Sequence, residues 1–449
     1  VIGNPPYAGE SSNKTEFAEK LVNKYRVEPG GHQKLQESNY KWLGDDYVKF
    51  IAFAEDLILK NGEGVLGMIT NNGYLNNPTF RGMRWRLTQT FNKILIIDLH
   101  GSSKKRETTP DGKRDENVFD IQQGVAIILA IKTPSEKPTN SNVFHSDLYG
   151  TRTQKFESLI NGIQFNRIEP SSKFFLFSNQ DSNLRKEYYD EVSLSELFHL
   201  FSTGILTKND RVAITFSPDE MWNNVNDFFH LTEKEIREKY SIKKDSRDWT
   251  LRRAMSDVSK FYSRDRIISV TYRPFDQRYS YYTGTPRGFM SYSQMKVMSN
   301  IFNKKNTVLI SGRQGQAVGS MNWNLAFITD EITDLNIFYR GGGTAFPLYL
   351  YHEDGLISPN FNASGLSSLT KSLSSGFSNE DVMDYIYAVL NSPSYREKYK
   401  EFLKIDFPRI LIPTQEEFDR LVPLGAQLRE LHLMKSAIID EYETTFPVA

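Results

Sequence analysis

The stretch Val1-Ile2-Gly3-Asn4-Pro5-Pro6-Tyr7 places Asn-Pro-Pro-Tyr directly after a short apolar run. The apolar residues predict a strand that runs into the motif. At average residue usage, this tetrapeptide is rare by chance in a chain of this length. A polyproline turn or linker is the competing interpretation, because adjacent prolines prefer extended backbone.

The chemistry that suits these residues is methyl transfer to an exocyclic amine. The amino group of adenine is a poor nucleophile because its lone pair is delocalised into the ring. The side-chain oxygen of Asn4 and the carbonyl of Pro5 supply two acceptors for the amino hydrogens, and proline adds no competing N–H. The ring of Tyr7 offers a face for a flat base that has left the duplex stack. The motif therefore predicts a base-methylating site without covalent catalysis.

Length and charge set wide limits. The 449 residues are enough for two or three domains with real cores. Basic and acidic residues are both 55, so the formal net charge is zero. The chain therefore has no global electrostatic signature of nucleic-acid binding, although a local basic cleft remains compatible with this balance.

Cysteine and histidine usage narrows the chemistry. The chain has no cysteine, which excludes disulfides and thiolate metal sites and fits a cytoplasmic protein. Its seven histidines are scattered without metal-ligand spacing, so the sequence predicts no metal site. Apolar runs are only strand-length, so no membrane span or signal peptide is expected.

Helical and strand-like segments alternate from residue 46 onward. Asn61-Gly62 is a helix end, and Asn77-Pro78 is an N-cap with proline at the first helical position. We expect a helix over 46–61, a strand over 65–69, a helix from 78 to about 91 and strands over 94–97 and 124–131. This order predicts α/β architecture, namely the second half of a Rossmann-like, doubly wound sheet.

The segment Gly62-Glu63-Gly64-Val65-Leu66-Gly67 matches the G-x-G-x-x-G pattern of dinucleotide-binding loops. That pattern binds phosphate only between a strand and the start of a helix, where backbone N–H groups face the ligand. Here it follows a predicted helix and enters a predicted strand, so we reject a dinucleotide site.

Further motifs carry a resemblance to a known family. Tyr47-Val48-Lys49-Phe50 and Gly67-Met68-Ile69-Thr70-Asn71-Asn72 resemble the catalytic half of amino-methylating DNA adenine methyltransferases. The chain more specifically resembles the fused Type ISP restriction–modification enzymes, through Phe80-Arg81-Gly82-Met83-Arg84, Asn117-Val118-Phe119-Asp120, Tyr272-Arg273-Pro274-Phe275, Phe346-Pro347-Leu348-Tyr349-Leu350-Tyr351 and Tyr395-Arg396-Glu397-Lys398-Tyr399. The resemblance spans nearly the whole chain.

This resemblance implies a domain order. The catalytic half of the methyltransferase occupies 1–160, an α+β target-recognition domain 161–377, and a helical C-terminal part of that domain 378–449. Residues 133–160 are polar, with Pro134 and Pro138, and are expected to connect the domains.

The resemblance also implies site residues. Asn4, Pro5, Pro6 and Tyr7 hold a flipped adenine, and Phe119 stacks on the base. An ordinary core position is the alternative for Phe119. Phe50 lies near the adenine of the cofactor in related enzymes. A buried position on an amphipathic helix is its alternative.

The cofactor implied is S-adenosylmethionine. Enzymes with this motif order carry the Gly-rich cofactor loop before Asn-Pro-Pro-Tyr, whereas this sequence begins at Val1 without methionine. We expect a fragment whose cofactor site is incomplete and which, isolated, binds cofactor weakly. The expected partners are double-stranded DNA and an upstream part of the same polypeptide, comprising the cofactor half and a helicase-like motor with a nuclease.

Cationic residues are the candidates for DNA contact. Lys104, Lys105 and Arg106 lie in a polar loop over 102–116, where a merely solvated loop is the alternative. Within the recognition domain the candidates are Lys208, Arg211, Arg252, Arg253, Arg273, Arg278 and Arg313, which lie among aromatic residues. Each has a structural alternative, such as a pair between Arg273 and Asp276.

The C-terminal segment predicts three helices. Ser378 with Asp381 and Thr414 with Glu417 resemble capping boxes, and Ser392-Pro393 opens a helix that ends before Pro408.

Three functions remain open. The first is site-specific N6-adenine methylation of DNA within a fused restriction–modification enzyme. The second is glutamine methylation of a protein, because an amide nitrogen poses the same chemical problem. The third is a non-catalytic DNA-binding component of a defence system. The long aromatic and Arg-bearing C-terminal sequence argues against the second.

Overall fold

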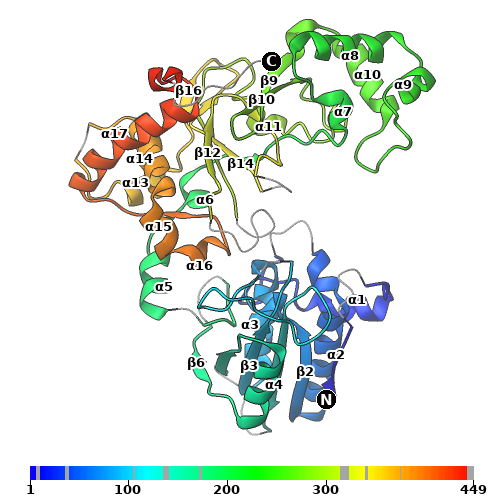
Figure 1. The fold of residues 1–449 in the computed structure, drawn as a ribbon, viewed down its shortest axis with the longest axis vertical. Coiled ribbons are helices and arrows are strands. Elements are labelled where there is room, and N and C mark those ends of the chain that lie inside the picture. The colour runs from blue at the N-terminus through cyan, green and yellow to red at the C-terminus, as the bar shows by residue number, and fades with distance from the viewer. Residues whose placement is uncertain are drawn as a thin grey trace. The chain divides into compact units, whose positions relative to one another are not determined.

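The computed structural model describes residues 1–6, 11–35, 40–104, 107–134, 141–170, 174–179, 181–313, 323–338, 342–374 and 376–441. The chain divides into two compact units, Val1–Arg185 and Lys186–Ala449. Figure 1 shows both units.

A six-stranded sheet forms the centre of the first unit. Its order is β1-β2-β4-β3-β5-β6. The strands are β1 (Ile2–Gly3), β2 (Gly64–Asn71), β3 (Lys93–His100), β4 (Val125–Lys132), β5 (Asn142–Asp147) and β6 (Asn166–Ile168). β1 is parallel to β2, and β3 is parallel to β5. β4 runs antiparallel between β2 and β3, so β1, β2, β3 and β5 all point the same way.

Helices cover both faces of this sheet. They are α1 (Glu16–Asn23), α2 (Asp46–Asn61), α3 (Arg81–Thr90) and α4 (Arg152–Asn161), with 3-10 turns at Lys41–Gly44, Asn72–Tyr74 and Pro78–Phe80. Residues of α1, α2 and α3 share one apolar core with alternate residues of β2, β3 and β4. The other alternate residues pack with Phe119 and with Leu159 of α4. Such two-sided cover is typical of α/β sheets.

Local signals set the helix limits as predicted. Gly62 ends α2 in the left-handed region, at φ 82°, and the chain then enters β2. The Gly62–Gly67 pattern therefore lies between a helix and a strand, which is the reverse of the order that a dinucleotide-binding loop requires. The side chain of Asn77 accepts from the Thr79 N–H, and Pro78 occupies the first helical position ahead of α3.

The predicted connection over residues 133–160 is wrong. β5 pairs with β3 along its whole length, and α4 begins at a capping box made by Thr151 and Gln154. The polar residues and prolines of this segment do not indicate a strand, and the partner of β5, which is β3, lies far away in the sequence. The first unit continues beyond residue 160 through β6, and the Phe177 N–H donates to the Leu75 carbonyl at 2.9 Å.

Buried Arg84 explains part of the Phe80–Arg84 signature. Its guanidinium has no exposed surface and, among the described residues, donates only to backbone carbonyls. The acceptors include Asn77 at 2.9 Å, Phe175 at 2.9 Å and Phe174 at 2.7 Å. Carbonyl acceptors replace the lost water, as a buried cation requires. Arg84 thereby holds the segment after β6 against the start of α3.

Gly82 and Arg81 fix the other side of α3. A Cβ on Gly82 would lie 2.0 Å from the Val27 carbonyl oxygen and 2.5 Å from that of Tyr25, so only glycine fits. Arg81 donates to both carboxylate oxygens of Glu28, at 2.6 and 2.5 Å. This bidentate geometry is the strong form of an Arg–carboxylate pair.

The second unit is α+β. Its sheets have the orders β10-β9-β13, β12-β11-β14-β8, β15-β16 and β17-β7. The strands are β7 (Val192–Ser193), β8 (Ser202–Thr203), β9 (Ile267–Arg273), β10 (Asp276–Tyr281), β11 (Val308–Ser311), β12 (Ala326–Thr329), β13 (Ile332–Thr333), β14 (Thr344–Pro347), β15 (Tyr349–Tyr351), β16 (Ile357–Pro359) and β17 (Arg409–Ile410). These short strands agree with the α+β architecture predicted for this part of the chain.

Helices surround these sheets. They are α5 (Ser182–Tyr189), α6 (Leu194–Leu197), α7 (Asp210–Ala213), α8 (Pro218–His230), α9 (Glu233–Lys239), α10 (Leu251–Phe261), α11 (Met295–Met298), α13 (Ala363–Leu369), α14 (Asn379–Asn391), α15 (Pro393–Lys398), α16 (Lys400–Leu403) and α17 (Gln415–His432), with 3-10 turns at Arg264–Arg266 and Ala437–Asp440. Over the described ranges of the chain, no helix combines the length and apolarity needed to cross a membrane.

The first and third predicted C-terminal helices are confirmed, whereas the second is divided into α15 and α16. Both capping boxes form, at Ser378 with Asp381 before α14 and at Thr414 with Glu417 before α17. Ser392 caps α15, which starts at Pro393. α14 and α17 pack closely at Gly425. A Cβ at this position would lie 1.9 Å from the Asp384 carbonyl oxygen, so glycine is required there.

Candidate functional site

The Asn-Pro-Pro segment lies at the carboxyl end of β1. Gly3 pairs with Met68 of β2, which brings Asn4 level with Ile69. Asn4 and Pro6 are exposed and Pro5 is buried, while Tyr7 lies outside the described residues. In open α/β sheets, ligands bind beyond the carboxyl ends of parallel strands. The predicted catalytic residues that the structure describes therefore occupy a ligand-binding edge.

The strands β2, β3 and β5 end at the same edge of the sheet, and each carries polar residues there. β2 ends at Asn71, which pairs across β4 with Val125, and Val125 pairs with His100 of β3. The register of β3 with β4 shifts between Asp98 and His100, and Asp98 pairs with Asp147 of β5. Asp98 and Asp147 lie one register position beyond the row of Ile69 and Asn4, and Asn71 lies two positions beyond it, so these polar residues all lie near the carboxyl ends of their strands.

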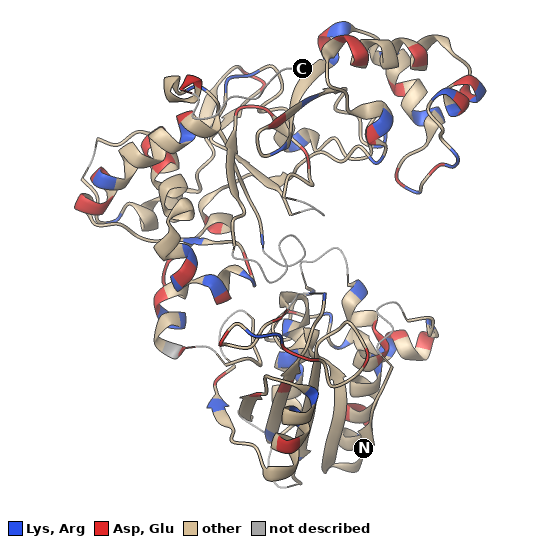
Figure 2. Cartoon of the chain, viewed as in Figure 1, with Lys and Arg blue, Asp and Glu red and all other residues tan. Residues whose placement is uncertain are grey.

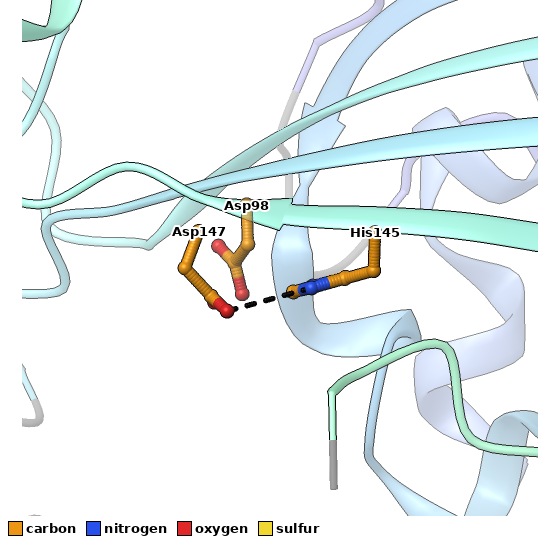
Figure 3. Close-up of side chains that lie close together, drawn as sticks. All are labelled: Asp98, His145 and Asp147. Carbon is orange, nitrogen blue, oxygen red and sulfur yellow. Dashed lines mark ion pairs between the residues drawn. The ribbon is translucent and has the colours of Figure 1, made fainter. Parts of the chain in front are cut away.

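Asp98, His100, His145 and Asp147 form a cluster at this edge. His100 Nε2 lies 2.8 Å from Asp147 Oδ1, and His145 Nδ1 lies 3.5 Å from Asp147 Oδ2. The Asn72 side-chain amide donates to Asp98 Oδ1 at 3.0 Å. Figure 3 shows Asp98, His145 and Asp147 pointing toward one another from adjacent strands.

Burial and charge act in opposite directions on the two histidines. Burial lowers the pKa of His145, and its carboxylate neighbours do not reverse that shift. Burial also lowers the pKa of His100, but Asp98 and Asp147 outweigh it, so the net shift of this pKa is upward. At neutral pH, His145 is consequently the neutral imidazole of the pair.

The loop between β3 and β4 carries Phe119. Asn117 organises this loop, because its amide donates to the carbonyls of Gly101 at 3.0 Å and Gln123 at 2.7 Å, and its oxygen accepts from the Phe119 N–H at 2.9 Å. The Phe119 ring is half-buried against the apolar cluster that contains Ile69. The ring is therefore neither fully in the core nor free, and its stacking role remains a prediction.

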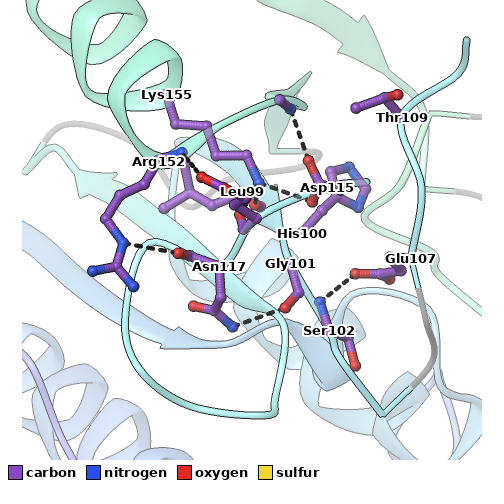
Figure 4. Close-up of polar contacts among 12 residues, drawn as sticks. Leu99, His100, Gly101, Ser102, Glu107, Thr109, Asp115, Asn117, Arg152 and Lys155 are labelled. Atoms are coloured by element: carbon purple, nitrogen blue, oxygen red, sulfur yellow. Dashed lines mark hydrogen bonds and ion pairs between the residues drawn. The ribbon is translucent and has the colours of Figure 1, made fainter. Parts of the chain in front are cut away.

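Lys155 of α4 anchors this loop through its ammonium group. Its ammonium contacts Asp115 Oδ2 at 2.8 Å and the carbonyls of Leu99 at 2.7 Å and Glu116 at 2.6 Å (Figure 4). The other carboxylate oxygen of Asp115 accepts from the Gly150 N–H at 2.7 Å. Three acceptors satisfy all three N–H groups of the buried lysine.

Phe50 is exposed on α2, with 47% of its surface accessible. The alternative interpretation of Phe50 as a buried helix residue is therefore wrong. Its neighbour Lys49 is the buried residue and donates to Ser11 Oγ at 2.9 Å. An exposed aromatic ring on a helix that packs on this half of the sheet suits a flat ligand such as the cofactor adenine.

The predicted cationic loop is only partly described. Lys104 is exposed, while Lys105 and Arg106 lie outside the described residues. The Lys104 N–H lies 3.5 Å from the Gln122 carbonyl oxygen, so the backbone there stays close to the Phe119 loop.

In the second unit, several of the predicted cationic residues lie around Tyr272. The Arg273 guanidinium lies 3.8 Å from its ring centroid, and the Arg278 guanidinium lies 6.0 Å from it. The Tyr272 hydroxyl donates to Asp210 Oδ2 at 2.8 Å, which brings Lys208 and Arg211, both exposed, to the same place. We call Lys208, Arg211, Tyr272, Arg273 and Arg278 the Tyr272 cluster.

The ion pairs in this cluster differ from the predicted one. Arg278, and not Arg273, pairs with Asp276, at 2.5 Å. Arg273 pairs with buried Asp334 at 3.0 Å. Burial raises the pKa of Asp334 to about 6, in spite of Arg273.

The remaining predicted cations lie elsewhere in the second unit. Arg252 and Arg253 are exposed on α10, where Arg252 lies 3.7 Å from Glu233. Arg313 lies 5.2 Å from the ring centroid of Phe407. Figure 2 shows basic and acidic residues mixed along α8, α9 and α10.

Sequence reasoning missed two groups. Lys155 with Asp115 gives no local signal, because lysine and aspartate are usually exposed. The pair of His145 and Asp147 had a usable signal, since residues two apart in a strand point to the same face. The polar residues and prolines of 133–160 favour a connection, which leaves no strand in which this spacing can be recognised.

A Rossmann-like half-sheet with Asn-Pro-Pro at the carboxyl end of a parallel strand, followed by an α+β unit, defines a methyltransferase joined to a recognition domain. Residues 1–104 match the family model of the Eco57I restriction–modification methylase, and residues 196–449 match that of the Type ISP C-terminal specificity domain. The second match covers more than half of the chain. The chain belongs to the Type ISP restriction–modification family.

Solved structures share this fold. The DrdV–DNA complex has a TM-score of 0.67 at 23% identity, over 96% of this chain and 44% of that one. The ATP-dependent Type ISP enzyme LlaBIII bound to DNA has a TM-score of 0.67 at 23% identity, over 96% of this chain and 29% of that one. A nuclease-deletion mutant of the Type ISP enzyme LlaGI with a DNA substrate mimic has a TM-score of 0.66 at 23% identity, over 96% and 41%. This chain thus spans less than half of each. No curated protein sequence matches it.

Proposed function

We propose that this chain supplies the catalytic wall and the target-recognition domain of a site-specific DNA adenine-N6 methyltransferase. The observation that carries the proposal is the placement of Asn4-Pro5-Pro6 at the carboxyl end of β1, within a methylase-type sheet. Glutamine methylation of a protein uses the same acceptors, but it gives no role to a specificity domain over 196–449.

In this proposal the chain's own residues act by placing acceptors. The Asn4 side-chain oxygen and the Pro5 carbonyl accept the two amino hydrogens of the adenine. This arrangement favours a pyramidal nitrogen, whose lone pair is then localised and available for attack. Exposed Asn4 can reach such a ligand, while buried Pro5 fixes the backbone beside it. Each hydrogen-bonding group acts best when it is held in place before the reaction.

Phe119 and Tyr7 would enclose the extruded base. The half-buried Phe119 ring stands on a loop at the same edge of the sheet as Asn4 and is fixed there through Asn117. Base–aromatic stacking contributes roughly 1–3 kcal/mol, which offsets part of the cost of unstacking a base.

S-adenosylmethionine, when bound, would supply the methyl group. The exposed ring of Phe50 fits the contact with its adenine. We propose that the upstream part of the same polypeptide completes this site and adds the helicase-like motor and nuclease. The shares of 29–44% that the chain covers in the solved relatives support this view.

DNA binding by the second unit is proposed for the Tyr272 cluster. The solved relatives were determined with DNA, and exposed Lys208 and Arg211 have room to reach phosphates. Replacing both with alanine should weaken binding to every sequence alike and reduce the salt dependence by about two phosphate contacts. Replacing Lys400 and Lys404, which pair with Glu397 and Glu401, is the charge-matched control.

The decisive experiment uses the complete gene that encodes this chain. It is expressed with Asn4 intact, as Asn4→Ala and as Asn161→Ala in a methylation-free host, and modified adenines are mapped by single-molecule sequencing. Asn161 is an exposed control at the end of α4. One recurring modified motif, absent only in Asn4→Ala, is expected. Soluble protein without any modified adenine would direct attention to a protein substrate or to a binding-only role.

A further inference from the structure

The cluster of Asp98, His145 and Asp147 has the donor set of a metal site. One potential ligand atom from each residue lies within 4.8 Å of the others. Asp98 comes from β3, whereas His145 and Asp147 are two residues apart on β5 and share one face. Two parallel strands that pair Asp98 with Asp147 therefore bring three ligand groups to one point.

The environment of His145 supports a metal site independently of this geometry. Its side chain is 1% exposed. Within the part of the chain that the structure describes, neither ring nitrogen has a hydrogen-bond partner. Its closest charged group, Asp147, is 3.5 Å away, which is too long for a hydrogen bond. A buried polar group without a partner is costly, and an ion is one of its accepted explanations.

The outer oxygens of both carboxylates already have donors. Asp98 Oδ1 accepts from the Asn72 amide at 3.0 Å and from the His100 N–H at 2.9 Å. Asp147 Oδ1 lies 2.8 Å from His100 Nε2. Asp147 Oδ2 lies 3.5 Å from His145 Nδ1, and Asp98 Oδ2 lies 3.7 Å from His100 Nδ1. Partners that orient the ligands from outside are characteristic of protein metal sites.

The backbone around His100 is shaped for this arrangement. His100 has a φ of 49°, in the left-handed region, and the register with β4 shifts between Asp98 and His100. A bulge at the end of a strand re-aims side chains and is frequent beside functional sites. Here it directs His100 toward both carboxylates instead of continuing along the strand.

We propose that Asp98, His145 and Asp147 bind a divalent transition metal ion of the zinc type. One imidazole and two carboxylates suit Zn²⁺ or Co²⁺ better than Mg²⁺ or Ca²⁺, which prefer oxygen alone. Metal–ligand bonds of about 2.0–2.2 Å require the three side chains to close in slightly. The Asp147 side chain is 33% exposed, which gives an ion its entry path.

Such an ion would join the ends of β3 and β5 on the sheet edge that carries Asn4. With three protein ligands, the fourth position of a tetrahedral ion is left for water. The inference concerns metal binding alone and does not depend on methyl transfer. The competing arrangement is an internal ion pair, in which a protonated His100 neutralises both carboxylates without metal.

The test uses the 449-residue chain, stripped of metal with a chelator. Zn²⁺ is titrated by calorimetry, and Co²⁺ is followed through its visible absorption, which reports coordination directly. We expect one ion per chain and an absorption spectrum of low-symmetry Co²⁺. His145→Gln should abolish the spectrum, while His32→Gln, an exposed histidine of the same unit, should keep it.

A second pair of variants guards against misfolding. Asp147→Asn keeps the shape of a partly exposed side chain and should lower metal affinity beyond the roughly 10- to 100-fold typical of outer partners. Asn72→Ala should lower it within that range. Circular dichroism confirms the fold of each. No stoichiometric binding to the folded parent chain, or binding equal in the parent, His145→Gln and Asp147→Asn proteins, overturns the metal site in favour of the internal ion pair.

Discussion

Lys155 and Asp115 form an ion pair in which neither side chain has exposed surface, with Nζ 2.8 Å from Oδ2. The pair connects α4 to the loop that carries Phe119. Breaking a buried pair by removing one partner leaves an uncompensated charge, which costs more than the intact pair contributes. The position of Phe119 therefore depends on a helix that starts more than thirty residues later in the chain.

Lys155→Met should destabilise the first unit by about 3–5 kcal/mol, because Asp115 is then buried without its partner. Urea denaturation followed by tryptophan fluorescence measures this change. The matched control is Lys20→Met, which removes a pair with Glu16 that is 70% and 82% exposed. Its effect should be close to zero. Equal stabilities of the two variants would show that the buried pair has no special importance.

Gly82→Ala should destabilise the same unit by more than about 2 kcal/mol, because the new Cβ has to displace backbone carbonyls that cannot rotate away. The carbonyl oxygens of Val27 and Tyr25 lie 2.0 and 2.5 Å from that Cβ position. Gly44→Ala is the control, because nothing lies within 4 Å of its Cβ. The thermal midpoints of the two variants decide the matter. A Gly82→Ala protein as stable as Gly44→Ala would contradict the close contact.

Phe119→Ala should reduce adenine methylation by the complete enzyme by about 5- to 150-fold, the loss of one base-stacking contact. Phe119→Tyr should retain activity. Fluorescence of 2-aminopurine at the target position reports base extrusion and should fall with Phe119→Ala alone. Ile121→Ala removes a neighbour from the same apolar cluster and controls for packing. A loss of extrusion in both alanine variants would mean that Phe119 acts only as a core residue.

Asp334 should make the second unit less stable as the pH rises. Its pKa is about 6 in the folded chain, above the ordinary 3.8, mainly because of burial. The folded state thus binds this proton more tightly, so stability is lost as pH increases from about 4 to about 7. Asp334→Asn should flatten this dependence in denaturation curves recorded across that range. A slope unchanged by the substitution would refute the raised pKa.

Local signals in the sequence predicted local structure well. Gly62, Asn77-Pro78 and the capping boxes at Ser378 and Thr414 act within a few residues, and the helices begin or end where these signals lie. The Asn-Pro-Pro strand and the α/β order were also predictable, because buried strands between helices have a distinct pattern.

Features that depend on distant partners were not predictable. β5 is recognisable mainly through its pairing with β3, and its short polar sequence resembles a linker. Arg84 has an ordinary helical context, and only the carbonyls of Phe174 and Phe175, some ninety residues away, make it a buried anchor. The expected pair between Arg273 and Asp276 fails for the same reason, since Arg273 pairs instead with Asp334, 61 residues away in the chain.

The hydrogen bonds from Arg84 to the carbonyls of Phe174 and Phe175 limit where recognition domains can be exchanged to engineer new specificities. A chimera that exchanges recognition domains at the compositional change near residue 161 would replace β6 and the carbonyls to which Arg84 donates. The recipient would then carry a buried guanidinium that keeps the carbonyls of Tyr74 and Asn77 but has lost those of Phe174 and Phe175. A junction placed after Arg185, where the first compact unit ends, leaves those contacts with their native partners.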